Sequence, residues 1–498
     1  MRLGQLIEGI PIRELEGDRE IEVKGLSYDS RRIQPGYLFV AIKGHTQDGH
    51  EFIHDATRNG AVALMAEELE GVPGNATKIT VSDSREALSM LAARFYNNPC
   101  EEMDIVGITG TNGKTTTTYL LESIVSAAGG SPGVIGTINR RFSGVTHASP
   151  VTTPESLDLM QIMREMSDTG VTHVVMEVSS HALDQKRTGG CPFKTALFTN
   201  LSRDHLDYHE TMEKYFQAKS LLFRNLRQGN NAVINIDDPR GEELIALTRA
   251  DVLTYGMARE ADVRADSVST DRKGLRARII TPTGEREIRS SLIGRLNIYN
   301  ILSAAATAMT LDIGLDAVVE GIERLRAVPG RLELVENNRG LAVVVDYAHT
   351  PDALLKAQET LRPLTGGRLI TVFGCGGDRD KGKRYEMGLA AGENSDIVFI
   401  TSDNPRSEDP GAIVDQIEEG TRQSGLSRAE WPARDTGPAY FIEVDRREAI
   451  RKAMTIADVN DLVLIAGKGH EDYQIVGSEK RRRDALMTGG RSHWPPVS

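Results

Sequence analysis

The segment Gly110-Thr111-Asn112-Gly113-Lys114-Thr115-Thr116 constrains the fold of this 498-residue chain more than any other stretch. It follows an apolar run at residues 105–108 and opens a helix predicted from Lys114 to Ala128. A strand, a glycine turn and a helix in this order hold phosphates, because backbone N–H groups and the helix N-terminus converge on the anion. Lys114 can reach the terminal phosphates, and the Thr115 hydroxyl can ligate Mg²⁺. We therefore predict a nucleotide site with a shortened loop, since Ile108 stands where the common pattern has glycine.

Bulk properties of the chain exclude several classes of protein. A chain of 498 residues exceeds what one hydrophobic core serves, so we expect about two to four domains. The formal net charge of −12 argues against nucleic acid as a partner. Three widely spaced cysteines form neither a disulfide framework nor a metal site, which favours the reducing cytoplasm. We expect no membrane insertion, because the N-terminus lacks a signal-peptide core and no run of about 18 apolar residues occurs.

Strand and helix patterns divide the chain into three parts. Residues 1–100 contain short β-like runs and a helix from Ser84 to Tyr96. The two later parts, residues 101–332 and 333–498, alternate near-continuously apolar strands with helices, as in a parallel sheet covered on both faces. The sequence therefore predicts an α/β fold. The expected strands are 21–23, 37–42, 61–65 and 78–81, then 104–109, 133–137, 173–178, 195–200 and 231–236, then 341–346, 369–373, 396–401 and 462–466, with residues 252–293 β-like and a helix at 301–311.

Polar residues follow the ends of the predicted strands. Ligands bind at the carboxyl ends of strands in parallel sheets, so these clusters hold the candidate binding residues. Each cluster could be turn chemistry alone, but four occur in the last part of the chain and three of those contain arginine or lysine. The clusters are Thr152–Pro154, Glu177–His181 and Asn200–His209 in the second part, and Asp346–Pro351, 374–384, 402–406 and 466–473 in the third.

Glu177 is the best metal candidate from the residues alone. A carboxylate within an apolar strand is costly to bury unless it is paired or coordinates a cation. Near a phosphate loop, a strand-end carboxylate suits Mg²⁺, and the alternative is a salt-bridged glutamate. Zinc is not expected, because His205 and His209 lack a thiolate or a third regularly spaced ligand.

Two other polar groups could serve either a structural role or a binding role. Asn297 and Asn300 stand three apart at the start of a predicted helix, where they can cap the helix or offer amides to a nucleotide. Asp29-Ser30-Arg31, taken alone, is typical of a turn.

With these clusters in view, the chain resembles the Mur ligase family from end to end. The phosphate loop, Glu177–His181, Asn200–His209, Asn297 with Asn300, and Asp346–Pro351 are similar to family motifs and stand in family order. The resemblance implies a small N-terminal α/β UDP-binding domain at 1–100. It also implies a central P-loop ATPase-like domain with a mostly parallel sheet at 101–332, and a C-terminal Rossmann-like, amino-acid-binding domain at 333–498. The shortened loop is a feature of the family.

The resemblance also implies a reaction. The block Asp403–Arg406 is similar to the motif of members that add meso-2,6-diaminopimelate to UDP-N-acetylmuramoyl-L-alanyl-D-glutamate. We expect an ATP-dependent ligase of cytoplasmic peptidoglycan precursor synthesis that acts on small molecules as a monomer, with ATP as co-substrate and Mg²⁺ as cofactor. The alternatives are another ligase of the superfamily, such as a folylpolyglutamate synthetase, and an ATP-hydrolysing switch or binding module.

Residue roles follow from the resemblance, position by position. Lys219 matches a lysine that is carbamylated in the family, where CO₂ turns the cation into an anion able to ligate Mg²⁺. Val151 departs from the family's usual asparagine. The catalytic set is Lys114, Lys219, Arg331 and His349; the ATP set is Gly110, Thr111, Asn112, Gly113, Lys114, Thr115, Thr116, Asn297, Asn300, Arg331 and Asp346; the metal set is Thr115, Glu177, His205 and carbamylated Lys219. The UDP-muramoyl-dipeptide set is Tyr28, Ser30, His45, Thr46, Gln47, Thr152, Thr153, Ser179, Gln185 and Arg187, and the diaminopimelate set is Arg379, Asp403, Asn404, Pro405, Arg406, Gly467 and Glu471.

Overall fold

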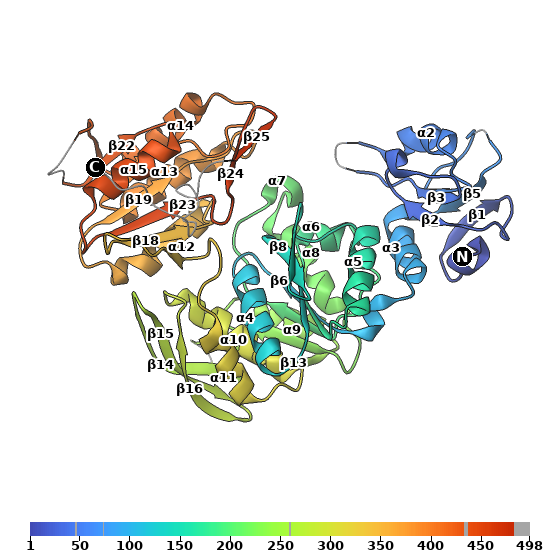
Figure 1. The fold of residues 1–498 in the computed structure, drawn as a ribbon, viewed down its shortest axis with the longest axis horizontal. Helices are drawn as coiled ribbons and strands as arrows, with labels where there is room; N and C mark the ends of the chain where they lie inside the picture. Colours follow the sequence, from blue (N-terminus) through green and yellow to red (C-terminus); the bar gives the residue numbers. More distant parts are fainter. Residues whose placement is uncertain (45–46, 73, 258–259, 433–436, 483–498) are drawn as a thin grey trace.

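The computed structural model describes residues 1–44, 47–72, 74–257, 260–432 and 437–482. Its three large sheets lie in three parts of the ribbon, with the N-terminal and C-terminal parts at opposite ends of the central part (Figure 1). This mixed α/β organisation confirms the predicted fold class. None of the helices in the described part of the chain is long and apolar enough to cross a membrane.

The N-terminal sheet has the strand order β1-β5-β4-β3-β2, and only β1 runs antiparallel to its neighbour. Helix α3 begins after Asp83, whose carboxylate accepts a hydrogen bond from Glu86 N at 2.9 Å. Leu91 of α3 and Met163 of α5 belong to one buried cluster, so this part shares a core with the central part. The elements are α1 Leu3–Leu6, β1 Ile12–Glu16, β2 Gly25–Ser27, η1 Ser30–Arg32, β3 Tyr37–Val40, η2 Gly49–Phe52, α2 Ile53–Arg58, β4 Ala63–Ala66, β5 Thr77–Val81, α3 Ser84–Phe95 and η3 Pro99–Glu102.

The central sheet has eleven strands in the order β16-β15-β14-β13-β12-β11-β6-β10-β7-β8-β9. Strand β6 lies between β10 and β11 and runs parallel to both, so the loops that follow these three strands meet at one edge. Helices α4, α10 and α11 contribute to the core on one face, and α5 and α8 to the core on the other. The elements are β6 Asp104–Thr109, α4 Lys114–Ala127, β7 Pro132–Ile135, β8 Asn139–Phe142, β9 Val145–Ala148, α5 Ser156–Asp168, β10 His173–Glu177, α6 Ser180–Asp184, β11 Thr195–Phe198, α7 Leu206–His209, α8 Met212–Arg224, β12 Asn231–Asn235, α9 Gly241–Leu247, β13 Asp251–Gly256, β14 Val263–Asp271, β15 Gly274–Thr281, β16 Gly284–Ser290, α10 Leu296–Met309 and α11 Leu315–Arg324.

The C-terminal sheet has the order β17-β18-β23-β19-β20-β22-β21. All its neighbouring strands are parallel except the pair β17 and β18. Buried clusters cover both of its faces, as the apolar strands predicted. The elements are β17 Glu333–Leu334, β18 Ala342–Asp346, α12 Pro351–Leu361, η4 Arg362–Leu364, β19 Leu369–Phe373, α13 Gly382–Asn394, β20 Ile397–Ile400, α14 Pro410–Gln423, β21 Ser427–Arg428, β22 Ala439–Ile442, α15 Arg446–Ile456, β23 Leu462–Ala466, and the hairpin β24 Tyr473–Val476 with β25 Glu479–Arg482.

One predicted strand, 21–23, is wrong. Glu22 makes only an isolated bridge with Arg2, although Val23 is buried. Strand β1, the hairpin β8–β9 and strand β22 were not predicted. The residues of β8 and β9 are mostly polar and partly or fully exposed, so hydrophobic alternation does not reveal them.

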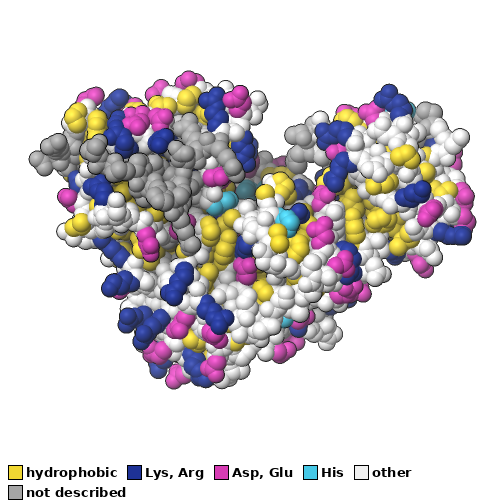
Figure 2. Space-filling model, viewed as in Figure 1, with side chains coloured by type: hydrophobic (Ala, Val, Ile, Leu, Met, Phe, Trp, Pro, Cys, Tyr) yellow, Lys and Arg dark blue, Asp and Glu magenta, His cyan; other side chains and the backbone are white. Residues whose placement is uncertain are grey.

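A hollow separates the N-terminal part from the C-terminal part on the face shown in Figure 2. Helices α6 and α7, which follow β10 and β11, lie on the side of the central part that faces this hollow (Figure 1). The carboxyl ends of the central strands therefore open toward both outer parts, which is where ligands bind in such sheets.

Candidate active site

The predicted phosphate loop connects β6 to α4, and two of its glycines are required by geometry. Gly110 has φ +141°, and a Cβ there would lie 1.9 Å from Thr199 Oγ1. Gly113 has φ +89°, and a Cβ there would lie 2.5 Å from Asn300 Oδ1. Any side chain at either position would clash and would strain the backbone.

The loop is held by its own lysine and by the segment after β11. Lys114 Nζ donates to Gly110 O at 2.8 Å and Thr111 O at 2.9 Å, and burial lowers the pKa of this ammonium. Asn200 Oδ1 accepts from Asn112 N at 3.0 Å, and Asn200 O accepts from Thr111 N at 2.8 Å. Thr116 is buried in the first turn of α4. The predicted loop residues thus form one compact turn at the N-terminus of a helix.

Glu177 is 1% exposed and is held by uncharged donors. Its Oε2 accepts from Thr115 Oγ1 at 3.1 Å and from Thr137 Oγ1 at 2.9 Å, and its Oε1 accepts from Thr137 N at 2.9 Å. Among the described residues no cation forms an ion pair with it, which removes the salt-bridge alternative there.

The donor set fits Mg²⁺, because a carboxylate and the Thr115 hydroxyl next to a phosphate loop supply the oxygen ligands that this ion prefers. No group of three or more metal-binding side chains occurs in the described ranges. A cation here would therefore take further ligands from phosphate oxygens and water.

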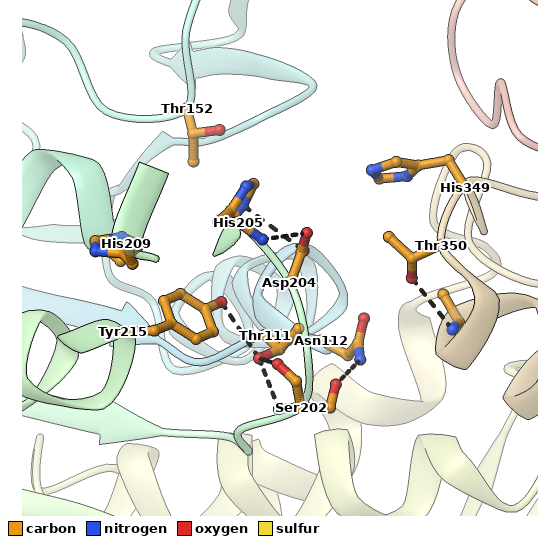
Figure 3. Close-up of polar contacts among 12 residues, drawn as sticks. Thr111, Asn112, Thr152, Ser202, Asp204, His205, His209, Tyr215, His349 and Thr350 are labelled. Carbon is orange, nitrogen blue, oxygen red and sulfur yellow. Dashed lines mark hydrogen bonds and ion pairs between the residues drawn. The ribbon is translucent and has the colours of Figure 1, made fainter. Parts of the chain in front are cut away.

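His205 lies in a cluster of rings that faces the open centre of the molecule. Its imidazole is 3.6 Å from Asp204 Oδ2, and its ring centroid is 5.0 Å from that of His181. Burial lowers the pKa of His205 to about 4, so the ring is neutral at pH 7 and offers a lone pair. Figure 3 shows His205, Thr152 and His349 around one open space.

Lys219 lies on α8 and is 1% exposed, which its place in the sequence did not indicate. Its Nζ donates to Gly110 O at 3.0 Å and lies 4.4 Å from the centre of the Tyr215 ring. Burial, followed by the positive charge of Lys114, holds the pKa of Lys219 well below its usual value. A neutral amine is the form that reacts with CO₂, so this environment fits the predicted carbamate.

The candidate muramoyl-peptide residues form a hydrogen-bonded group beside Glu177. Thr153 Oγ1 donates to Glu177 O at 2.8 Å and accepts from Ser179 N at 3.1 Å. Arg187 donates to Thr153 O at 2.9 Å and to Gln185 Oε1 at 2.7 Å.

Thr152, one residue earlier, shares a hydrogen bond with Thr137. Val151 is 44% exposed, and its side chain takes no part in this hydrogen-bonded group.

The N-terminal candidates are less tightly connected. Tyr28 OH donates to Asp158 Oδ2 of α5 at 2.5 Å, Ser30 is buried, and Gln47 is exposed. His45 and Thr46 lie outside the described residues. The structure therefore brings Tyr28 against the central part, and among the described residues no hydrogen bond joins Tyr28, Ser30 and Gln47.

Arg331 joins the phosphate loop to the C-terminal part. Its Nη2 lies 3.3 Å from Thr115 Oγ1, and its guanidinium carbon is 4.6 Å from the centre of the Tyr347 ring. Asp346 Oδ2 accepts from Leu332 N at 2.7 Å, and burial raises the pKa of this carboxyl. His349 contacts Tyr347 O through Nδ1 at 2.8 Å, and burial lowers its pKa.

The two asparagines at the start of α10 bond each other and the backbone. Asn297 Nδ2 donates to Ile293 O at 2.8 Å, and Asn300 Nδ2 donates to Asn297 Oδ1 at 2.9 Å. The capping interpretation is wrong, because the N-cap of α10 is Arg295 and, among the described residues, no side chain makes a capping hydrogen bond. Asn300 Oδ1 lies against Gly113, which leaves the nucleotide interpretation.

The diaminopimelate candidates meet at the carboxyl end of the C-terminal sheet. Asn404 Nδ2 donates to Glu471 Oε2 at 3.2 Å, and Arg406 Nη1 donates to Gly377 O at 2.7 Å. A Cβ on Gly376 would lie 3.0 Å from Arg406 Nη1 and 3.9 Å from Arg379 Cγ, so both arginines flank one loop. Asp403 and Pro405 are buried, and Gly467 lies against Asp403.

Two buried cations at this edge, Lys468 and Arg446, were not predicted as site residues from the sequence. The signal for Lys468 was its place inside the predicted cluster 466–473, between two candidate residues. Arg446, at the start of α15, follows no candidate motif, so the sequence offered no signal for it.

Comparisons with known proteins agree with these motifs. Family models match in three places, as Mur ligase family, catalytic domain at 22–96, Mur ligase middle domain at 108–308, and Mur ligase, glutamate ligase domain at 330–469. A relative from Geobacter metallireducens, named UDP-N-acetylmuramoyl-L-alanyl-D-glutamate–2,6-diaminopimelate ligase, is 47% identical and aligns over 97% of this chain and 96% of its own.

Solved structures agree as well. One titled as the structure of a UDP-N-acetylmuramoyl-L-alanyl-D-glutamate–2,6-diaminopimelate ligase has a TM-score of 0.69 at 32% identity and covers 98% of both chains. The MurF ligase of Thermotoga maritima, solved in complex with ADP, shares the fold with a TM-score of 0.63 at 20% identity, over 90% of this chain and 94% of its own. The chain belongs to the Mur ligase family, as its motifs predicted.

Proposed function

We propose that this protein is an ATP-dependent ligase that joins meso-2,6-diaminopimelate to the D-glutamate of UDP-N-acetylmuramoyl-L-alanyl-D-glutamate. The observation that carries the proposal is the contact between Arg331 and Thr115, which sets a cation from the edge of the C-terminal part against the phosphate loop. Full-length similarity to relatives named for this reaction supports the same choice. The reaction belongs to peptidoglycan precursor synthesis in the cytoplasm, and the chain acts as a monomer.

The chemistry begins by activating a poor electrophile. The substrate carboxylate attacks the γ-phosphorus of ATP and forms an acyl phosphate, and ADP leaves. The neutral amine of the amino acid then attacks the acyl carbon, and inorganic phosphate departs from the tetrahedral intermediate, leaving an amide. Lys114 and Arg331 neutralise charge that develops on the transferred phosphoryl group, and their contacts at the phosphate loop support this role.

The amine must lose a proton during this reaction. His349 is the proposed acceptor, because its Nδ1 is held by Tyr347 O and its lowered pKa keeps the ring neutral at pH 7.

Two Mg²⁺ sites complete the proposal. Bound Mg²⁺ would neutralise the phosphate oxygens and align them for transfer. Thr115 and Glu177 would hold one ion, and His205 with carbamylated Lys219 the other. The burial of Glu177 among uncharged donors and the lowered pKa of Lys219 support these assignments.

The outer parts of the chain select the other substrates. Residues 1–100, with Tyr28, Ser30 and Gln47, bind the UDP end, and residues 333–498 bind the amino acid. Arg406 grips the distal carboxylate that distinguishes diaminopimelate from lysine, because a guanidinium can donate two parallel hydrogen bonds to it. Glu471 favours the ammonium at the same end. A site with such groups left unpaired rejects the shorter amino acid strongly.

A coupled phosphate-release assay tests the function. Phosphate should appear only when ATP, UDP-muramoyl dipeptide and diaminopimelate are all present, and replacing diaminopimelate with lysine should abolish most of the signal. Phosphate release from ATP alone would identify an ATP-hydrolysing switch instead. Equal turnover of the two amino acids would overturn the proposed specificity while leaving the ligase chemistry standing.

A further inference from the structure

Lys468 lies in a buried cluster of charges behind the Asp403–Arg406 motif. Its side chain is 2% exposed, and its Nζ lies 3.7 Å from Asp403 Oδ1 and 3.4 Å from Glu471 Oε2. Arg446 is fully buried, and both carboxylates counter the burial that lowers its pKa. Two cations therefore balance two carboxylates in this cluster, so neither carboxylate needs the charge of Arg406, which also acts on the Asp378 carboxylate.

Lys468 and the backbone N–H of Ile475 together define the orientation of the Asn404 amide. Asn404 Oδ1 accepts from Lys468 Nζ at 2.8 Å and from Ile475 N at 2.9 Å. An amide oxygen accepts about two hydrogen bonds, so this oxygen is satisfied and the NH₂ group must face the other way. Asn404 Nδ2 indeed donates to Glu471 Oε2 at 3.2 Å. Lys468 thus contacts both residues of this pair and links them.

The backbone around the motif is fixed as well. Arg406 N donates to Ile475 O at 3.1 Å, Gly477 N donates to Arg406 O at 2.7 Å, and Arg406 has φ +51°. Gln474 Nε2 donates to Asp403 O and to Ser402 Oγ. Because the main chain is held by β24, the freedom left to the site is in the Asn404 and Glu471 side chains, which Lys468 restrains.

We propose that Lys468 is a positioning residue for amino-acid selection: it holds the Asn404 amide and the Glu471 carboxylate in the one arrangement that receives the distal end of the amino acid. The inference rests on the proposed function. Without Lys468 the Asn404 oxygen keeps only one of its two donors, Ile475 N, and the two carboxylates outweigh Arg446. Both effects weaken the capture of a carboxylate by Arg406, and neither acts on the phosphate loop.

The test uses Lys468→Met in the full chain, with Lys452→Met as the matched control. Lys452 lies in the same C-terminal part, pairs with Glu443 and is remote from the motif in the sequence. Lys468→Met should raise KM for diaminopimelate at least about tenfold, with KM for ATP within about twofold of the unsubstituted protein. Lys452→Met should change neither constant, and Lys468→Arg, which keeps the cation, should recover part of the loss.

A double-mutant cycle separates positioning from an independent structural role. If Lys468 acts partly through Asn404, the variant Asn404→Leu with Lys468→Met should lose less affinity for diaminopimelate than the sum of the two single losses. Additive losses would overturn the proposal. So would an unchanged KM for diaminopimelate in a Lys468→Met protein that melts normally, or the failure of both Lys468 variants to fold, since that makes the lysine a folding residue.

The proposed function can fail separately. In that case the unsubstituted protein itself shows no phosphate release that depends on diaminopimelate.

Discussion

At the scale of single residues, the site depends on side chains whose charge is set by burial. Lys219 and His205 both lose positive charge more readily than they would in water, and both lie near the phosphate loop. The Gly110 carbonyl accepts from Lys114 and from Lys219, so two lysine side chains converge on one oxygen and the charge of Lys114 repels a second positive charge there. Converting Lys219 to an anionic carbamate would replace that repulsion with an attraction.

The carbamate gives a prediction for Lys219. Depleting CO₂ and bicarbonate should slow phosphate release, and returning bicarbonate should restore it, because the carbamate forms reversibly on a neutral amine. A Lys219→Ala variant should be slow under both conditions, and labelled CO₂ should give a carbamate NMR signal that this variant lacks.

Lys214→Ala is the matched control, since Lys214 is an exposed lysine of the same helix that pairs with Glu210. A rate in the unsubstituted protein that does not respond to bicarbonate would refute the carbamate.

At the scale of elements, helices α13 and α14 are joined by a buried arginine. Arg384 of α13 is fully buried and contacts Glu408 through two bonds of 2.8 and 3.0 Å and Gln416 of α14 at 2.9 Å. This arrangement satisfies a guanidinium that would otherwise be costly to bury. The pair lies next to the loop of Gly376, which flanks Arg406, so it also supports the edge at which we propose that the amino acid binds.

The pair gives a prediction for stability in acid. The hydrogen bonds of Arg384 lower the pKa of Glu408 to about 2, below the value of about 4.3 expected in the unfolded chain. A depressed carboxyl pKa stabilises the fold above the unfolded value, and that contribution is lost as the pH falls from about 4.3 toward about 2. Glu408→Gln should therefore melt several degrees lower than the unsubstituted protein at pH 7, and the difference should shrink below about pH 4.

Glu393→Gln serves as the control, because Glu393 is exposed on α13. A melting difference for Glu408→Gln that stays constant down to pH 3 would contradict this account.

The sequence predicted what depends on local pattern and missed what depends on distant contacts. The glycine loop and the apolar parallel strands were predictable, because turn geometry and burial on both faces constrain residue type directly. The polar hairpin β8–β9 was not, since its pairing depends on its place beside β7. The sequence around Lys219 on α8 predicts an ordinary solvent-exposed helix lysine. The side chain is buried because α8 packs under the phosphate loop. Lys468 and Arg446 are hidden for the same reason.

At the scale of the whole molecule, the two outer parts are attached differently. The N-terminal part shares an apolar core with the central part through α3 and α5. The C-terminal part is held by polar contacts such as Ser202 to Asp352 at 2.8 Å, and by Ile293, which is buried in the apolar cluster of the C-terminal part. Polar contacts between domains permit relative motion, so we expect closure to move the C-terminal part more than the N-terminal part.

Arg272 makes three of these polar contacts. It stands at the tip of the β14–β15 hairpin and donates to three backbone carbonyls of the C-terminal part: Leu364 O at 2.9 Å, Val459 O at 3.1 Å and Asn460 O at 2.7 Å. Arg272→Ala should broaden the range of domain arrangements seen by small-angle X-ray scattering and lower kcat, because the reacting groups are aligned less often.

The adjacent exposed cation provides the control, as Lys273→Ala should change neither scattering nor kcat. Identical scattering and kcat for Arg272→Ala and the unsubstituted protein would show that the three bonds do not hold the domains together.

The hydrogen bonds between Lys114 and the carbonyls of its own loop have a consequence for ligand discrimination. An anion that binds Lys114 has to replace Gly110 O and Thr111 O as hydrogen-bond acceptors of the ammonium. Binding therefore exchanges two existing hydrogen bonds for new ones. The free energy of losing these two hydrogen bonds is offset more easily by a polyphosphate than by a singly charged anion. The loop therefore binds weakly charged anions less tightly than it binds a ligand of high charge density.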